Sequence, residues 1–160
     1  MANEILPLRI GVGIVVLNSN NQVFVGKRKD NPNDKWQMPQ GGVDEREDNF
    51  AAMQRELIEE TSIKNIKIIK EIEGVFEYEL PENLVGIIWK GKFRGQKQKW
   101  FLLEMLAEDD AVSMDCGPKP EFDHWSWVSF WYPLTQVVDF KREVYRHALV
   151  ALAPHLPLKE

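Results

Sequence analysis

The chain has 160 residues, with 44% hydrophobic residues, 28% charged residues and a formal net charge of −5. This length and composition predict one well-packed globular domain over residues 1–160. The acidic balance disfavours a protein that coats nucleic acids, because such proteins are usually basic. The single cysteine, Cys116, excludes an internal disulfide and is typical of a reducing compartment.

The sequence predicts neither a signal peptide nor a transmembrane helix. Glu4 interrupts the start of the chain, and a turn sequence follows the first apolar run where a signal peptide would be cleaved. No apolar stretch approaches the roughly 20 residues that span a bilayer. We therefore expect a cytoplasmic protein.

The first predicted elements form a β-hairpin. Residues 10–17 are rich in β-branched side chains, and residues 22–27 form a second short apolar run after a turn sequence. Residues 30–34 predict a loop. A helix follows over about 47–61, and its apolar side is predicted to contain Phe50, Leu57 and Thr61.

The second half of the chain predicts more strands and a closing helix. The strands are expected at 67–72, 84–90, 99–106 and 125–131, and a polar loop at 107–121. The last helix is expected to begin near Asp139, a good N-cap residue, and to end before Pro154. These elements predict an α/β domain in which a sheet lies between helices.

Three glutamates stand together on the helix predicted at 47–61. Each helical residue advances about 100°, so Glu56, Glu59 and Glu60 fall within about a third of the circumference, opposite the apolar side. Crowded like charges cost stability, which a bound divalent cation would relieve. Mg²⁺ or Mn²⁺ suits such oxygen ligands, and the carbonyl of Gly41 is a further candidate ligand because a glycine turn allows close approach.

The spacing around these glutamates resembles the signature of the Nudix hydrolase family. That signature is a glycine, five residues, a glutamate, seven residues, and then Arg-Glu-apolar-x-Glu-Glu-x-Gly-apolar. The matching residues are Gly41, Glu47, Arg55, Glu56, Leu57, Glu59, Glu60 and Ile63. Ser62 stands where the family has glycine, so either Ser62 adopts the left-handed exit conformation with some strain or Asn65 makes the turn.

The resemblance implies a Nudix-type α/β/α sandwich with a mixed sheet, and hydrolysis of a phosphoanhydride bond. It also implies that Glu121, which precedes the last predicted strand, is a fourth carboxylate at the metal site and a candidate general base. We expect Arg55 to hold a carboxylate such as Glu47 in a bidentate pair. The predicted catalytic residues are Arg55, Glu56, Glu59, Glu60 and Glu121, and all of these except Arg55 are also predicted metal ligands.

Segments outside the signature are similar to the branch of the family that acts on 5′-triphosphorylated RNA and on dinucleoside polyphosphates. Phe140 is expected either to stack on a base or to be a core aromatic residue. Because strand side chains alternate, Lys97 and Lys99 are expected to face the cleft together. The predicted substrate-binding residues are Arg9, Lys27, Arg28, Gln40, Gln96, Lys97, Lys99, Phe140 and Lys141.

The resemblance implies removal of pyrophosphate from the 5′-triphosphate end of RNA, which leaves a 5′-monophosphate. An alternative is asymmetric hydrolysis of diadenosine tetraphosphate and related dinucleoside polyphosphates. A third possibility, from another class, is a non-catalytic nucleotide-binding module. The crowded glutamates disfavour this module, because a protein that only binds nucleotides gains little from them.

Overall fold

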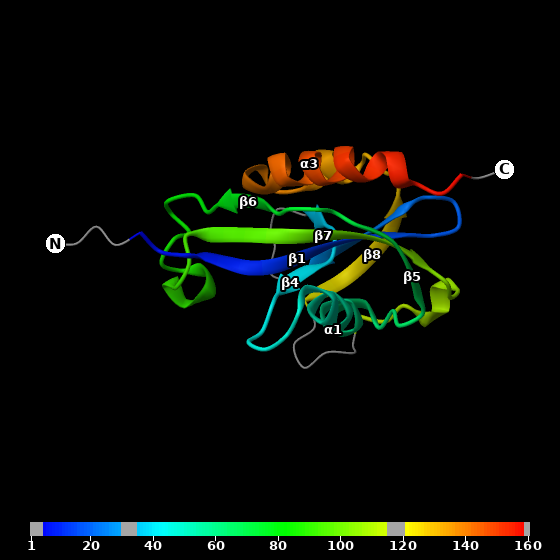
Figure 1. The fold of residues 1–160 in the computed structure, drawn as a ribbon, viewed down its shortest axis with the longest axis horizontal. Coiled ribbons are helices and arrows are strands. Elements are labelled where there is room, and N and C mark those ends of the chain that lie inside the picture. Colours follow the sequence, from blue (N-terminus) through cyan, green and yellow to red (C-terminus); the bar gives the residue numbers. More distant parts are fainter. Residues whose placement is uncertain (1–4, 30–34, 115–120, 159–160) are drawn as a thin grey trace.

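The computed structural model describes residues 5–29, 35–114 and 121–158. Across these residues, eight strands form one mixed sheet with helices on both faces (Figure 1). The expected α/β/α sandwich is therefore confirmed. The strands are β1 (Leu8–Leu17), β2 (Val23–Arg28), β3 (Trp36–Gln37), β4 (Gln40–Gly42), β5 (Ile66–Glu71), β6 (Phe76–Glu79), β7 (Gly95–Met105) and β8 (Phe122–Val128).

Strand β1 lies at the centre of the sheet. It pairs in parallel with β7 along its whole length, from Leu8 opposite Gly95 to Leu17 opposite Glu104. It pairs antiparallel with β2 and β4. Antiparallel pairs also join β2 to β3 and β8, and β7 to β5 and β6. The one parallel pair among antiparallel neighbours makes the sheet mixed.

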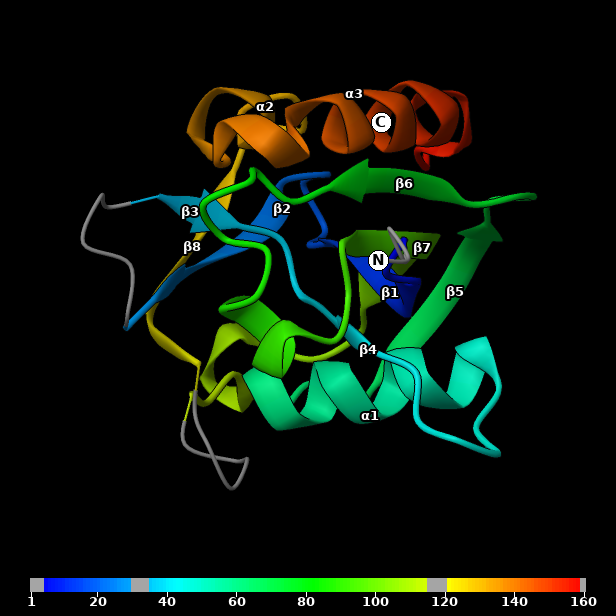
Figure 2. The ribbon, with the colours of Figure 1, turned by 90° about the vertical axis from the view of Figure 1, so that its left-hand side faces the viewer.

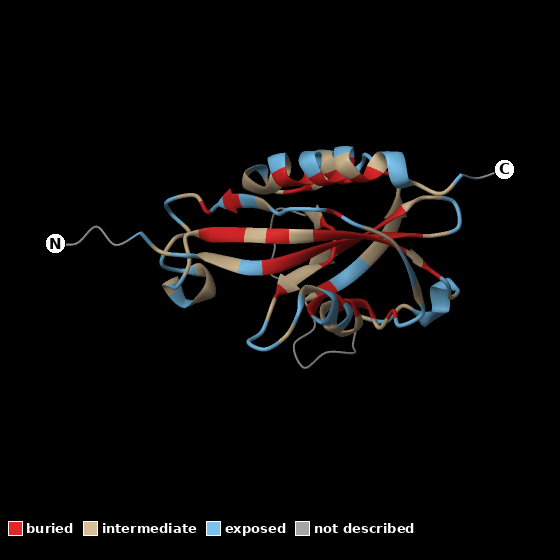
Figure 3. Cartoon of the chain, viewed as in Figure 1, coloured by how far each residue is buried: buried red, intermediate tan, exposed pale blue. Residues whose placement is uncertain are grey.

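The two faces of β1 are covered by different helices. Helix α1 (Asn49–Thr61) packs on one face, and α3 (Arg142–Leu152) lies over the other (Figure 2). Val12, Ile14 and Val16 belong to the apolar cluster under α1, whereas Val15 and Leu17 belong to the cluster under α3. This alternation explains why the buried part of β1, after Arg9 and Ile10, contains only apolar residues and glycine. Figure 3 shows that β1 is buried over its second part and partly exposed at its start.

Helix α1 begins and ends with identifiable caps. Asp48 is the N-cap, and its carboxylate accepts a hydrogen bond of 2.7 Å from the backbone N–H of Ala51. At the other end Ser62 adopts a left-handed conformation, with φ of 65°, and its backbone N–H bonds to the carbonyl of Ile58. Ser62 itself, and not Asn65, therefore makes the exit turn that the family builds with glycine.

The buried side of α1 differs from the predicted one. Phe50 is 39% exposed, and the buried residues are Ala52, Met53, Leu57, Glu60 and Thr61. The buried stripe is thus rotated toward Glu60, because the helix lies against β1 and β4 and turns this carboxylate inward.

The strand predicted at 84–90 was wrong. This segment consists of turns and a 3₁₀ helix (Ile88–Gly91), in which Trp89 and Lys90 have positive φ values of 54° and 58°. Ile87 is 71% exposed. The apolar run had the composition of a strand, but its residues pack on the domain without alternating. The strand that pairs with the beginning of β7 is instead β6, which was not predicted.

The remaining elements follow the prediction with shifted boundaries. Strand β8 begins earlier than expected. The short strands β3 and β4 and a short helix α2 (Pro133–Gln136) were not predicted. A 3₁₀ turn (Asp139–Lys141) precedes α3. Asp139 was expected to be the N-cap of the helix, but its side chain forms an ion pair with Arg142 at 2.9 Å. Two further 3₁₀ turns are Asp109–Ala111 and Ala153–His155.

Some expectations concern residues that the structure does not describe. The loop predicted at 30–34 and Cys116 lie outside the described residues. Within the described part of the chain, none of the helices has the length and apolar character needed to cross a bilayer.

Candidate active site

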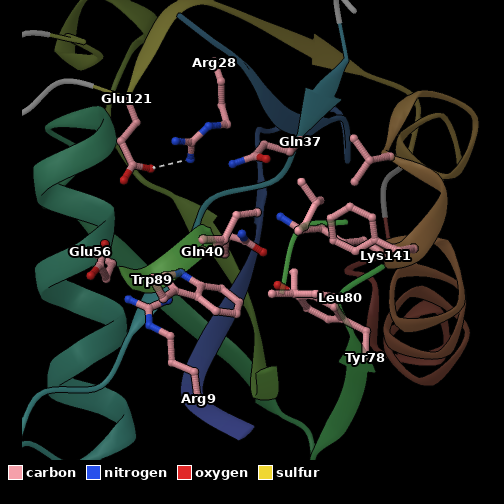
Figure 4. Close-up of a pocket in the computed structure, with 15 residues that line it drawn as sticks. Arg9, Arg28, Gln37, Gln40, Glu56, Tyr78, Leu80, Trp89, Glu121 and Lys141 are labelled. Carbon is pink, nitrogen blue, oxygen red and sulfur yellow. Dashed lines mark hydrogen bonds and ion pairs between the residues drawn. The ribbon is translucent and has the colours of Figure 1, made fainter. Parts of the chain in front are cut away.

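A cavity of about 620 Å³ lies beside Glu56 of α1. Its walls come from β1, β3, β4 and β6, from the segment 80–89, and from the start of the last helical region (Figure 4). The described lining combines three cations, two carboxylates and three aromatic rings: Arg9, Arg28, Lys141, Glu56, Glu121, Tyr78, Trp89 and Phe140. Such a lining suits an anionic ligand that also carries a flat ring.

The glutamates of α1 next to this cavity are not simply solvated. Glu60 is 4% exposed, and no described group donates a hydrogen bond to either of its carboxylate oxygens. Burial raises the pKa of Glu60 well above its ordinary value, and the nearby Glu121 and Glu56 charges raise it further. Burial also raises the pKa of Glu56 to about 7, against the opposing effect of Arg55.

Arg55 connects strand β4 to the acidic helix. Its guanidinium donates to both carboxylate oxygens of Glu47 at 2.8 and 2.9 Å, to Glu56 at 2.9 Å and to the carbonyl of Gly42 at 2.8 Å. The expected bidentate pair with Glu47 is confirmed, and it lowers the pKa of Glu47 to about 2. Arg55 also approaches Glu59 at 3.4 Å. It therefore orients carboxylates and is not among the residues that line the cavity.

Gly41 and Gly42 belong to strand β4, which pairs with β1, and do not form the turn that was predicted. Gly41 lies against the acidic helix because it lacks a side chain. A Cβ at Gly41 would collide with the carboxyl group of Glu56. From the other side, Gln96 donates toward the carbonyl of Gly41 at 3.5 Å and accepts from the hydroxyl of Tyr78 at 2.9 Å. Gly41 thus lies with its Cα against the Glu56 side chain and its carbonyl near the Gln96 amide, and its role as a metal ligand stays a prediction.

Arg9 is held between a glycine and a tryptophan. A Cβ at Gly42 would collide with the Arg9 guanidinium, so this group lies directly on the glycine backbone. Its other neighbour is the Trp89 ring, whose centroid is 5.2 Å from the guanidinium carbon (Figure 4). This cation–π contact and the glycine contact together limit where the positive charge of Arg9 can lie.

The opposite part of the cavity contains Glu121, Arg28, Lys141 and Phe140. Glu121 precedes β8 and pairs with Arg28 at 3.2 Å. Burial lowers the pKa of Lys141 to about 8, and the Arg28 charge contributes to this shift. Phe140 lines the cavity with its ring 5.7 Å from that of Tyr78. Phe140 is thus accessible from the cavity as well as packed on the core.

The structure brings together only part of the predicted substrate-binding set. Arg9, Arg28, Gln40, Phe140 and Lys141 line the cavity. Four other predicted residues are absent from its described lining: Lys27, Gln96, Lys97 and Lys99.

The alternation of β7 explains most of this difference. Gln96 and Gln98 face strand β4, and Gln98 donates to Gln40 at 3.0 Å. Lys97 and Lys99 therefore point to the other side of the strand, where Lys99 lies 3.9 Å from Glu71. The glutamines, and not the lysines, are the β7 side chains on the cavity side, and they hold β4 in place.

Several lining residues had no signal in the sequence. Trp89 lies in the apolar run that was interpreted as a strand, and Tyr78 lies in the strand that was not predicted. Gln37 precedes Gly41 by four residues, and its side chain is buried at the cavity wall.

The residues fit a divalent cation, although they are not arranged as a closed site. Within residues 5–29, 35–114 and 121–158, no three acidic, histidine or cysteine side chains converge as a ready metal site. However, the oxygens of Glu60 lack donors, and burial disfavours the ionised forms of Glu56 and Glu60. A cation would supply the positive charge that these carboxylates lack. The ligand set stays a prediction.

Comparisons with known proteins agree with this geometry. The model of the NUDIX domain family matches residues 7–148. A protein of Pelagibacter ubique named RNA pyrophosphohydrolase is 57% identical over 88% of this chain and 89% of its own length. Its namesake from Stutzerimonas stutzeri is 48% identical over 95% and 96%.

Solved structures share the fold at lower identity. The E. coli dihydroneopterin triphosphate pyrophosphohydrolase superposes with a TM-score of 0.70 at 20% identity, covering 92% of this chain and 99% of that one. A C. elegans Ap4A hydrolase superposes with a TM-score of 0.64 at 21% identity, covering 90% and 98%. The family model matches most of the chain, and the fold is an α/β/α sandwich with the acidic helix at a cavity. This chain therefore belongs to the Nudix family.

Proposed function

We propose that this protein removes pyrophosphate from the 5′-triphosphate end of RNA and leaves a 5′-monophosphate. The relatives named RNA pyrophosphohydrolase are similar along nearly the whole chain, which supports this substrate. The observation that carries the proposal is a cavity in which Glu56 of the acidic helix lies with three cations and Phe140. A cytoplasmic location, where RNA substrates occur, is part of the proposal.

Nudix hydrolases generally use divalent metal ions, and we propose Mg²⁺ or Mn²⁺ for this one. Glu56, Glu59, Glu60, Glu121 and the carbonyl of Gly41 are the groups that would hold them. Bound ions would neutralise phosphate charge and activate the attacking water. The buried, unpaired oxygens of Glu60 support this assignment.

The side chains of the protein itself bind and orient the substrate. Arg9, Arg28 and Lys141 offer positive charge to the triphosphate from different walls of the cavity. Phe140 offers a ring on which the base of a terminal nucleotide can stack. We assign the role of general base to Glu121, whose carboxylate lies at the cavity wall beside Arg28. Arg55 keeps Glu56 and Glu47 in fixed orientations.

The test is a paired substrate assay. Triphosphorylated RNA and diadenosine tetraphosphate are supplied separately at equal concentration with Mg²⁺ or Mn²⁺, and the products are identified. We expect pyrophosphate and 5′-monophosphorylated RNA, formed faster than any product of the dinucleotide. Faster cleavage of diadenosine tetraphosphate would overturn the proposed substrate, and no turnover of either would favour a non-catalytic nucleotide-binding module.

One observation favours dinucleoside polyphosphates as the second candidate. Trp89 and Phe140 both line the cavity, and they come from different walls. Two aromatic surfaces are what a substrate with a base at each end would use. The same assay ranks this candidate against the first.

A further inference from the structure

Two arginines contact the acidic groups of the site in different ways. Arg55 donates to both carboxylate oxygens of Glu47 at 2.8 and 2.9 Å, and it is absent from the described lining of the cavity. Arg28 lines the cavity, and its Nη1 atom lies 3.2 Å from Oε2 of Glu121 (Figure 4). The Arg28–Glu121 pair therefore meets the space in which a ligand would bind.

The pairing of two strands brings Arg28 and Glu121 together. The register of β2 with β8 shifts between Lys27 and Arg28, and the shift places Arg28 opposite Phe122. Next to this pair, the N–H of Lys29 donates to the carbonyl of Glu121 at 3.0 Å. An irregularity of this kind re-aims side chains and is common next to active sites. The main chain of Glu121 is thus held by β2, while its carboxylate contacts Arg28.

The charge of Arg28 also acts on the acidic helix. Burial raises the pKa of Glu60, and the Glu121 and Glu56 charges raise it further, whereas the Arg28 charge lowers it. Arg28 therefore supplies part of the positive charge that these carboxylates require when they are ionised. This is the electrostatic task that we propose for a divalent cation.

The Arg28–Glu121 pair is easy to exchange for another partner. Its distance of 3.2 Å is long for a charge-assisted hydrogen bond, and its two side chains are 31% and 40% exposed. Ion pairs this open to solvent are weak. A divalent cation is bound directly by carboxylate oxygens and is the largest local charge in such a site. Glu121 can therefore leave Arg28 for a cation at small cost.

The exchange would leave the guanidinium of Arg28 at the cavity wall beside the proposed triphosphate. A guanidinium forms bidentate hydrogen bonds with phosphate as well as with a carboxylate. The same side chain can therefore hold the carboxylate first and a phosphate afterwards.

We propose that Arg28 is a positioning residue for Glu121, which holds this carboxylate until a divalent cation takes it and then binds a phosphate of the substrate. The inference rests on the proposed function, which supplies both the cation and the phosphate. It adds a competition between Arg28 and the metal to the binding roles already given to Arg28 and Glu121. The binding of metal and of substrate is thereby coupled through one side chain.

The experiment measures two properties of Arg28→Gln, which keeps a polar side chain but removes the charge. The first is the dissociation constant of Mn²⁺ without RNA, by titration calorimetry. The second is KM for triphosphorylated RNA at saturating Mn²⁺. Arg146→Gln is the matched control, because Arg146 forms an ion pair with Glu143 at 2.7 Å and is absent from the described lining of the cavity.

The two properties are expected to change in opposite directions. Mn²⁺ should bind Arg28→Gln about two- to five-fold more tightly, because the ion no longer has to displace a guanidinium. KM for the RNA should rise roughly ten-fold, because a phosphate contact is lost. The control should match wild type in both. An arginine with a purely structural role would weaken both kinds of binding, and one that only binds phosphate would leave Mn²⁺ binding unchanged.

A double-mutant cycle separates competition for Glu121 from simple repulsion between Arg28 and the ion. In the Glu121→Gln background, the further change Arg28→Gln should leave the dissociation constant of Mn²⁺ unchanged, because the carboxylate for which the two cations compete is absent. If the tightening persists in full in this background, Arg28 only repels the ion and the inference is wrong.

Other results also have defined meanings. Unchanged or weaker Mn²⁺ binding by Arg28→Gln would overturn the competition, and an unchanged KM would overturn the transfer of Arg28 to phosphate. If wild type turns over no triphosphorylated RNA while the cycle gives the expected result, the proposed function is wrong but the competition for Glu121 stands. If Arg28→Gln does not fold, Arg28→Met, which keeps the apolar stem, replaces it with the same expected signs.

Discussion

At the scale of single residues, burial separates three glutamates that are equivalent in the sequence. The side chain of Glu59 is 41% exposed and that of Glu56 is 14% exposed, whereas Glu60 is almost completely buried. The deeper a carboxylate lies, the more its ionised form depends on a compensating charge. Glu60 is therefore the member of the set whose charge most requires a cation.

We predict that Glu60→Gln lowers turnover by roughly 100-fold or more and leaves the protein folded. The amide keeps the volume of the carboxyl but cannot supply its charge to a cation. The measurements are kcat on triphosphorylated RNA and the urea midpoint of unfolding. Glu45→Gln, at an exposed position, is the control and should match wild type. A folded Glu60→Gln variant with wild-type turnover would refute the metal assignment.

At the scale of elements, left-handed residues other than glycine occur at the end of α1 and in a segment that lines the cavity. Helix α1 ends in a left-handed serine, and the segment 81–92 contains two consecutive non-glycine residues with positive φ, Trp89 and Lys90. Left-handed conformations cost an L-residue with a side chain roughly 1–2 kcal/mol. In the segment 81–92 this conformation places Trp89 at the cavity wall.

Ser62→Gly is expected to stabilise the protein by about 0.5–1 kcal/mol, because glycine adopts the left-handed exit conformation without the Cβ clash. Chemical denaturation in urea measures the change. Ser19→Gly serves as control, since Ser19 is an exposed turn residue without a positive φ, and it should give no gain. A destabilised Ser62→Gly variant would mean that the weak hydrogen bond from the Ser62 hydroxyl to the Ser113 carbonyl, at 3.2 Å, outweighs backbone strain.

Trp89→Leu is expected to raise KM for triphosphorylated RNA by about 5–30-fold, because the Arg9 guanidinium loses the ring on which it lies. Trp89→Phe keeps an aromatic face and should recover most of the affinity. Trp131→Leu, an exposed tryptophan outside the cavity, should leave KM unchanged. The idea that Trp89 positions Arg9 fails if KM of Trp89→Leu equals that of wild type.

At the scale of the whole molecule, the site joins residues that are far apart in the chain. The parallel pairing of β1 with β7 and the antiparallel pairing of β1 with β4 bring Arg9, Gly41 and Gln96 together. The 3₁₀ turn before α3 adds Phe140 and Lys141. Glu56 and Glu60 are buried in this folded assembly, so the free energy of unfolding depends on whether their carboxyl groups are ionised.

This linkage predicts how stability depends on pH when divalent ions are removed by a chelator. The pKa of Glu56 is about 7 in the folded protein against an ordinary value of 4.5, and the pKa of Glu60 is also raised. Above pH 4.5 the unfolded chain loses these protons first, so the stabilising contribution is complete below pH 4.5 and is lost as pH rises through 7. The urea midpoint should therefore fall from pH 5 to pH 7.5.

Added Mg²⁺ or Mn²⁺ should raise this midpoint more at pH 7.5 than at pH 5, because the ions bind ionised carboxylates. In Glu56→Gln the fall with pH in the chelated protein should be shallower, since one of the titrating groups is gone. A chelated wild-type protein whose midpoint is flat or rises over this range would show that the buried glutamates do not titrate as described.

The sequence by itself determined the acidic helix, the Arg55–Glu47 pair and the family, whereas the glycine turn that it predicted is strand β4. These features are local: helical spacing and a fixed number of residues bring their atoms together, whatever the rest of the chain does. The apolar run of β1 likewise predicted a buried strand from composition alone.

Only the tertiary structure decided which glutamate is buried, which face of β7 meets the cavity, and that residues 84–90 form a wall and not a strand. The burial of Glu60 depends on how α1 lies on the sheet, and the positions of Lys97 and Lys99 depend on the register of β7 with β1. The positions of Gln37 and Trp89 at the cavity depend on neighbours many residues away. Such contacts are set by packing between elements, which local sequence patterns do not contain.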